Sequence, residues 1–109
     1  MAYDEGLAQR VREVLADRRD LTEKKMFGGL CFLLGGNMCC GIVGEELMLR
    51  VGPEGYEDVL AKPHAREMDF TGRALRGMVY VGIGGLGSDG ALREWLKPAV
   101  AFAGGLPPK

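Results

Sequence analysis

Glycine-centred breaks cut residues 26–51 into short apolar runs, and this pattern constrains the fold more than any other feature. The segment reads MFGGLCFLLGGNMCCGIVGEELMLRV, with two-residue breaks at Gly35-Gly36 and Gly44-Glu45. Apolar runs of this length, separated by two residues that include glycine, are typical of β-hairpins. The segment therefore predicts an antiparallel meander with strands at residues 30–34, 37–43 and 46–51.

A two-residue loop fixes which residues of a hairpin stand opposite each other. The first loop pairs Cys31 with Cys40, and the second pairs Ile42 with Leu47. One face of the sheet then carries only apolar side chains and is the expected core: Cys31, Leu33, Met38, Cys40, Ile42, Leu47, Leu49 and Val51. We expect this face to pack against the terminal helices through Leu7, Val11, Val14, Trp95 and Leu96.

The opposite face mixes large apolar side chains with charges: Leu30, Phe32, Leu34, Asn37, Cys39, Gly41, Val43, Glu46, Met48 and Arg50. Apolar area of this extent marks an interaction site. The predicted interaction face therefore comprises Leu30, Phe32, Leu34, Val43, Met48 and Arg50. Two coverings remain open, a symmetric homodimer through this face or residues 52–76 folded over it.

Helical patterns flank the meander. Apolar residues at helical spacing predict an amphipathic helix over residues 4–18 with Asp4 as its cap. A second helix is predicted at residues 90–103, with Ser88 or Asp89 as cap and a kink or restart at Pro98.

The segment between the meander and the last helix is less regular. A short helix is predicted from Gly52-Pro53 to Pro63. Residues 64–76 lack a clear period and predict an extended loop with a brief strand at residues 68–70, followed by a last strand at residues 77–81. The chain is thus predicted to be one domain of residues 1–109 in the α+β class. It has two layers, with an antiparallel β-meander flanked by N- and C-terminal helices and a short inserted helix.

Charge and hydropathy narrow the range of partners. Fourteen basic and fifteen acidic residues give a net charge of -1, so no overall field attracts nucleic acid or anionic lipid. The basic residues between Arg10 and Lys25 are interspersed with acidic ones, which indicates a solvated helix face rather than a nucleic-acid surface. The apolar runs are too short to span a membrane, and the N-terminus MAYDEG does not resemble a signal peptide. We expect a cytoplasmic protein that does not bind membranes.

The glycine-rich run GIGGLG at residues 82–87 matches the dinucleotide fingerprint G-x-G-x-x-G. That fingerprint requires a βαβ unit with an acidic residue about 20 positions further on, and the chain is too short for the second strand. We therefore expect a strand-to-helix connection and no dinucleotide cofactor.

The three cysteines and the single histidine do not form a convincing reactive site. Adjacent Cys39 and Cys40 point to opposite faces of a strand and cannot share one metal ion. Cys31 and Cys40 are expected to be buried thiols, with a strained cross-strand disulfide as the alternative. Cys39, on the mixed face, is the candidate for a reactive thiol, and His64 is expected at the surface. We predict no catalytic, cofactor-binding or metal-binding residues.

Four segments together resemble the TfoX/Sxy N-terminal domain. They are KKMFGG (residues 24–29), GNM (36–38), LMLRVGPEGYEDVL (47–60) and FTGRALRGMVYV (70–81). The run EWL at residues 94–96 and the closing LPPK fit stand-alone members, without the C-terminal domain that competence regulators carry. The resemblance implies an α+β fold with an antiparallel sheet flanked by helices, and it brings no catalytic motif.

The expected function is a small bacterial regulatory module that acts through protein contacts, in the setting of transcription or competence regulation. Its protein partner is not identified by the sequence. Two alternatives remain, a nucleic-acid-binding regulator and a cysteine-dependent enzyme that would use Cys39 or His64. Rapid alkylation of Cys39 would favour the enzyme, and salt-sensitive retention on DNA would favour the nucleic-acid-binding regulator.

Overall fold

The computed structural model of the chain describes residues 3–26, 28–70 and 73–109. In these residues a helix precedes a run of four strands, and a second helix, two further strands and a last α-helix follow, an order typical of an α+β domain. The helices are α1 (Glu5–Val14), α2 (Gly52–Leu60) and α3 (Asp89–Gly104), with a short 3-10 helix η1 (Ile83–Gly85). The strands are β1 (Leu21–Met26), β2 (Gly29–Leu34), β3 (Asn37–Val43), β4 (Glu46–Arg50), β5 (Ala65–Phe70) and β6 (Arg73–Val81).

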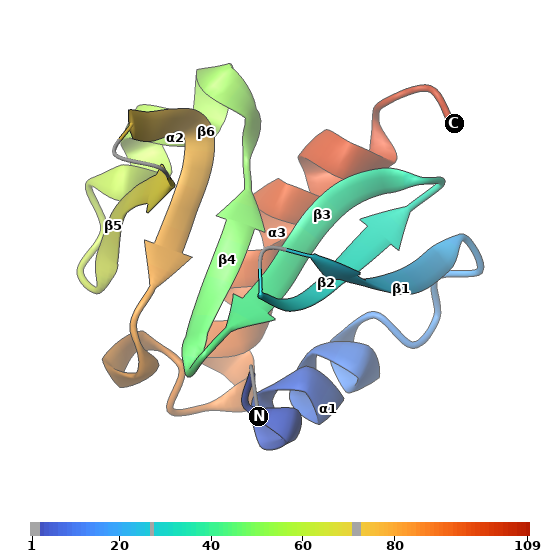
Figure 1. Cartoon of the computed structure of the whole chain (residues 1–109), viewed down its shortest axis with the longest axis horizontal. Coiled ribbons are helices and arrows are strands. Elements are labelled where there is room, and N and C mark those ends of the chain that lie inside the picture. Colours follow the sequence, from blue (N-terminus) through green and yellow to red (C-terminus); the bar gives the residue numbers. More distant parts are fainter. Residues whose placement is uncertain (1–2, 27, 71–72) are drawn as a thin grey trace.

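The described strands form one antiparallel sheet in the order β1-β2-β3-β4-β6-β5. In Figure 1, α3 passes behind β3 and β4, α1 runs along the lower edge of the sheet, and α2 lies near β5 and β6. The predicted α+β fold, with an antiparallel sheet and flanking terminal helices, is confirmed.

The helix boundaries follow from their caps. The Asp4 carboxylate accepts a hydrogen bond from the Leu7 backbone N–H at 3.2 Å, and the Ser88 hydroxyl accepts one from the Ala91 N–H at 3.1 Å. Each bond satisfies a backbone donor that has no partner within the first turn. Asp4 is thus confirmed as a cap, and Ser88 is the cap of α3. Helix α1 ends earlier than predicted, at Val14, and α3 continues through Pro98 without restarting.

Strand β5 corrects the prediction of an extended loop at residues 64–76. Residues Ala65–Phe70 pair with β6 as a hairpin, and β6 begins at Arg73 rather than at residue 77. The predicted piece at residues 68–70 is the end of this longer strand. Charged residues such as Arg66 and Glu67 hide the strand pattern because β5 lies at the edge of the sheet, where charges are common.

A β-bulge changes the predicted register between β2 and β3. The pairs Leu34 with Asn37 and Leu33 with Met38 form as predicted, but Phe32 then pairs with Cys40. The extra residue on β3 is Cys39, since a bulge sets two residues of one strand opposite one of its partner. Cys31 therefore stands opposite Gly41, and the predicted pairing of Cys31 with Cys40 is wrong. The register between β3 and β4 is as predicted.

The bulge redistributes the side chains between the two faces of the sheet. Leu30, Phe32 and Leu34 were assigned to the mixed face, yet they are buried in the core that the helices cover. Cys40, Ile42, Leu47, Leu49 and Val51 lie in this core as predicted, together with Leu7, Val11, Trp95 and Leu96 from the helices, and Val14 packs at its border. Cys31, Leu33 and Met38 belong to a second cluster on the other face of the sheet.

Candidate interaction face

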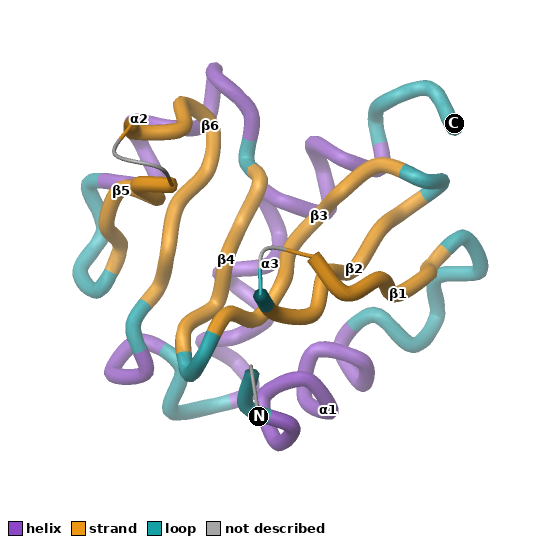
Figure 2. Tube along the Cα trace, viewed as in Figure 1, coloured by secondary structure: helices purple, strands orange, loops and turns teal. Residues whose placement is uncertain are grey.

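The second cluster defines a surface that we call the methionine face. It comprises Met26, Cys31, Leu33, Met38, Val43, Met48, Met68, Met78 and Tyr80. These residues come from all six strands of the described sheet. In the part of the chain that the structure describes, no helix crosses this front face of the sheet (Figure 2).

The methionine face has two layers. Cys31, Met48 and Met68 form its floor and are at most 1% exposed. The floor is dense because Gly41 has no side chain: a Cβ there would stand 2.7 Å from the terminal methyl carbon of Met48 and 2.8 Å from the Leu30 carbonyl oxygen. The remaining six residues are half-buried and form the layer that borders solvent.

Methionine is segregated between the two faces. Five of the six methionines of the chain lie on the methionine face, whereas the buried helix-side cluster contains none among the described residues. That core is built from leucine, valine, isoleucine and aromatic side chains, which pack in well-defined rotamers. Methionine is unbranched and polarisable, and it is common at surfaces that adapt to a partner. The face therefore differs in chemistry from the core on the other side of the same sheet.

Charged side chains border the methionine face at β4 and β5. Arg66 of β5 forms an ion pair with Glu46 of β4, and its guanidinium carbon lies 4.6 Å from the centre of the Tyr80 ring. This stacking holds the ring in place between the two strands. Partial burial raises the pKa of Tyr80, while the nearby Arg66 acts in the opposite direction. The rim thus fixes an aromatic side chain at the edge of an apolar surface.

The structure separates the residues of the predicted interaction face. Leu30, Phe32 and Leu34 lie under the helices, and only Val43 and Met48 lie on the methionine face. Arg50 turns away from both groups: its guanidinium hydrogen bonds to the Met38 carbonyl oxygen at 3.5 Å and lies 5.2 Å from the centre of the Phe102 ring.

Seven residues of the methionine face were not predicted to belong to an interaction face: Met26, Cys31, Leu33, Met38, Met68, Met78 and Tyr80. One signal could have found the methionines among them. Five described strands, all except β2, contain one methionine each, and the described helices contain none.

The cysteines are buried rather than poised for chemistry. Cys31, Cys39 and Cys40 are at most 1% exposed and are free thiols. Burial raises the pKa of Cys31 from its ordinary value of 9.0 to about 11. A hydrogen bond with Cys39, together with burial, holds the pKa of Cys40 well above its usual range. A thiol acts as a nucleophile only as the thiolate, and a reagent must be able to reach it. Cys39 was proposed as reactive because it was expected on the mixed face, and its burial removes that reason.

The raised cysteine pKa values predict that the protein loses stability in alkaline solution. Folded Cys31 keeps its proton until about pH 11, whereas in the unfolded chain it loses the proton near pH 9.0. The folded state binds more protons than the unfolded state in this interval. The stability that protonated Cys31 contributes is therefore fully present below pH 9.0 and is lost as the pH rises toward 11. Urea unfolding at a series of pH values measures the fall. A Cys31→Ala variant should show a shallower fall, and equal slopes in the two proteins would contradict this origin.

The glycine-rich run at residues 82–87 serves the packing of His64. His64 is exposed, as predicted, and adopts a left-handed backbone conformation with φ of 75°. A Cβ on Gly84 would stand 2.9 Å from His64 Cε1, so a larger residue there would require the imidazole ring to shift. Gly82 donates its backbone N–H to the His64 carbonyl oxygen at 3.0 Å, and the Gly85 carbonyl accepts from Trp95 Nε1 at 3.0 Å. The run therefore joins the turn before β5 to α3.

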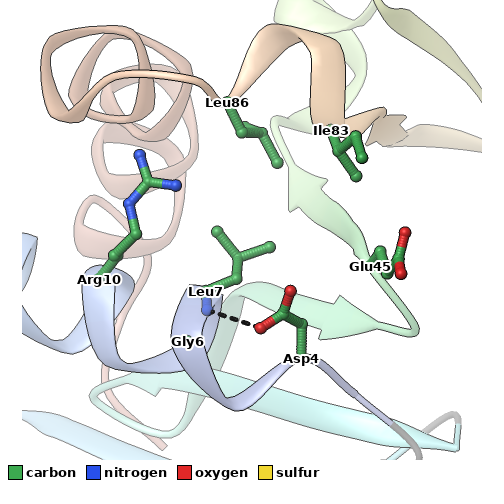
Figure 3. Close-up of a pocket in the computed structure, with 7 residues that line it drawn as sticks. All are labelled: Asp4, Gly6, Leu7, Arg10, Glu45, Ile83 and Leu86. Atoms are coloured by element: carbon green, nitrogen blue, oxygen red, sulfur yellow. Dashed lines mark hydrogen bonds between the residues drawn. The ribbon is translucent and has the colours of Figure 1, made fainter.

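A hollow beside the N-terminus of α1 is the other notable surface feature (Figure 3). It has a volume of about 370 Å³ and is lined by Asp4, Gly6, Leu7, Arg10, Glu45, Ile83 and Leu86. Two of its polar side chains are already engaged, since Asp4 caps α1 and Arg10 bonds to Asp89 at 3.2 Å. No cluster of three or more candidate metal ligands exists among the described residues. Among the described helices, none combines the length and apolar character that a membrane crossing requires.

Comparison with protein-family models matches residues 13–103 to the TfoX N-terminal domain. The matched segment covers most of the chain and includes the six strands that the structure describes. The chain belongs to the TfoX N-terminal domain family. Comparison with curated proteins and with solved structures gave no significant match. The family assignment agrees with the resemblance found in the sequence and supports a TfoX-like regulatory module.

The arginines Arg10, Arg12 and Arg18 in the basic run of this TfoX N-terminal domain form ion pairs within the fold. Arg12 bonds to both carboxylate oxygens of Glu23, at 2.7 and 2.9 Å, and this bond lowers the pKa of Glu23. Arg18 pairs with Asp20 at 3.3 Å. A nucleic-acid surface depends on cations that are free to bind phosphate. The ion pairs therefore favour the prediction of a solvated helix face over a nucleic-acid surface.

Proposed function

We propose that this TfoX N-terminal domain is a regulatory module that binds a partner protein through its methionine face. The observation that supports the proposal is the segregation of methionine onto a sheet face that no described helix covers. The proposed setting is the cytoplasm, in the regulation of transcription or competence. The role of the domain in that setting is to bind and not to catalyse.

The two layers of the face suit such a role. The buried floor keeps the strands in register, so the surface exists before the partner arrives and costs little to order. The half-buried layer, with Met26, Met38 and Met78, can change rotamers to follow the shape of a partner, because methionine has three rotatable bonds. Tyr80, held by Arg66, supplies a rigid anchor beside this adaptable area.

A Leu33→Lys substitution tests the proposal. Leu33 lies in β2, half-buried on the methionine face between Thr22 and Met38. A lysine there keeps its stem on the sheet and places a charge in the apolar surface. We expect the variant to fold and to lose the proteins that the native chain captures from the cytosol of its own cells. Quantitative mass spectrometry of the captured proteins gives the measurement.

The matched control is Ala16→Lys, which adds the same charge at an exposed position after α1. It should capture the same proteins as the native chain. Capture that is equal with Leu33→Lys and with the native chain would contradict the proposal. Light scattering identifies the special case of a homodimer: a dimeric native chain that Leu33→Lys makes monomeric has a second copy as its partner.

A further inference from the structure

The sulfur-containing residues in the described part of the chain fall into two classes by exposure. The three cysteines, Met48 and Met68 are at most 1% exposed. Met26, Met38 and Met78 are half-buried and lie in the upper layer of the methionine face. An oxidant in solution therefore meets thioether sulfur before it meets a thiol.

The cysteines are poor competitors for an oxidant on chemical grounds as well. Peroxides react with the thiolate rather than with the thiol, and they need access to the sulfur atom. Cys31 and Cys40 have raised pKa values, so their thiols remain protonated at neutral pH. Cysteine, the usual sulfur target of oxidants, is thus inaccessible in this fold, whereas the upper layer of the methionine face borders solvent.

From this arrangement we propose that the methionine face is an oxidation site, and that sulfoxide formation at Met26, Met38 and Met78 releases the partner protein. The release of the partner rests on the proposed function, and the site of oxidation rests on the partial exposure of these three methionine residues. The reagent class is a peroxide, of which hydrogen peroxide is the simplest member.

The oxidation requires only the peroxide and the methionine thioether, and no other group of the protein takes part. A sulfur lone pair attacks one peroxide oxygen, an S–O bond forms and the O–O bond breaks. Sulfur is oxidised, the peroxide is reduced, and the leaving hydroxide takes the proton of the transferred oxygen to give water. A methionine sulfoxide reductase, which draws electrons from thiols, returns the thioether.

Segregation of methionine determines what the oxidation changes. A sulfoxide is polar, so it weakens an apolar contact surface. The helix-side core contains no methionine among its described residues, and the two methionines of the floor are fully buried. Oxidation of the upper layer therefore changes the surface of the folded domain and leaves the main core as it is. The same segregation that makes the face adaptable makes it sensitive to oxidants.

The experiment treats the full chain with dilute hydrogen peroxide and follows each sulfur by peptide mass spectrometry. We expect Met26, Met38 and Met78 to form sulfoxides before Met48, Met68 and the three cysteines are oxidised. The proteins that the native chain captures through Leu33 should then bind roughly tenfold more weakly, the equivalent of losing the burial of about one side chain. Treatment with methionine sulfoxide reductase should restore binding.

Two variants keep the test specific. A triple Met→Leu variant at positions 26, 38 and 78 preserves side-chain volume and removes the oxidisable sulfur, so its affinity for the partner, measured before and after peroxide, should not change. A double Met→Leu variant at positions 48 and 68 should remain as sensitive as the native chain. Two results overturn the proposal: a fully oxidised upper layer that still binds, or a triple variant that peroxide still inactivates. An unoxidised chain with no Leu33-dependent partner contradicts the proposed function itself, whereas binding that survives oxidation contradicts only the oxidation switch.

Discussion

A Gly29→Ala substitution is expected to destabilise the domain by about 3 kcal/mol or more. Gly29 begins β2, and a Cβ there would stand 2.0 Å from the Ile42 carbonyl oxygen and 3.0 Å from its carbonyl carbon. Both atoms are backbone, so no side-chain rotation can relieve the overlap. β2 and β3 would have to move apart near Leu30, which pairs with Ile42 and belongs to the helix-side core. Denaturant unfolding of the two proteins measures the difference in the free energy of unfolding.

The matched control for this substitution is Gly90→Ala. Gly90 lies in the first turn of α3, and a Cβ there meets nothing within 4 Å. Alanine restricts the unfolded chain and favours the helix, so the variant should be as stable as the native protein or more stable by up to about 1 kcal/mol. A Gly29→Ala protein that is as stable as Gly90→Ala would show that β2 does not approach β3 as closely as described.

The meander could be predicted from the sequence because its turns are local. Gly35, Gly36 and Gly44 all have positive φ values, a conformation that glycine adopts without steric cost. Two-residue loops then determine the pairing of the residues next to them. Leu34 with Asn37 and Val43 with Glu46 are correct for this reason.

The bulge at Cys39 could not be predicted, because β2 is apolar on both faces. Alternation identifies the buried face of a strand only when the other face is polar. In β2, the set with Phe32 and the set with Leu33 are equally apolar, so either could face the helices. One extra residue in β3 decides between them. Without this residue, the predicted register assigned each side of β2 to the wrong face of the sheet. The candidate interaction face was misplaced for the same reason.

The methionine face also depends on contacts between residues that are distant in sequence. Met26 and Met78 come from β1 and β6, which are not neighbours in the sheet, and they belong to one surface only because the strand order β1-β2-β3-β4-β6-β5 places both strands in the same sheet. The strand that carries Met68 was predicted to be mostly loop. Its charged residues suit an edge strand, and only the pairing with β6 identifies it. The methionine in each of five strands could be read from the sequence. That these residues share one face could be known only from the order of the strands in the sheet.

A Phe32→Ala substitution is expected to cost about 3 to 5 kcal/mol of the free energy of unfolding, as truncation of a buried aromatic side chain does. Phe32 is fully buried in the helix-side core with Leu92 and Leu96. The next residue offers the control. Leu33 is half-buried on the methionine face, so Leu33→Ala should cost less, about 1 to 2 kcal/mol, because part of its apolar area stays in contact with water in the folded chain.

The division of the sheet into a helix-covered core and an open methionine face is the central claim, and these two adjacent residues test it most directly. The measurement is urea unfolding of the native protein, Phe32→Ala and Leu33→Ala under identical conditions. The bulge at Cys39 predicts that Phe32→Ala is destabilised by at least about 1 kcal/mol more than Leu33→Ala. The regular hairpin without a bulge, which buries Leu33 under the helices and leaves Phe32 on the other face, predicts the reverse order. A larger loss for Leu33→Ala than for Phe32→Ala would contradict the assignment of the two faces.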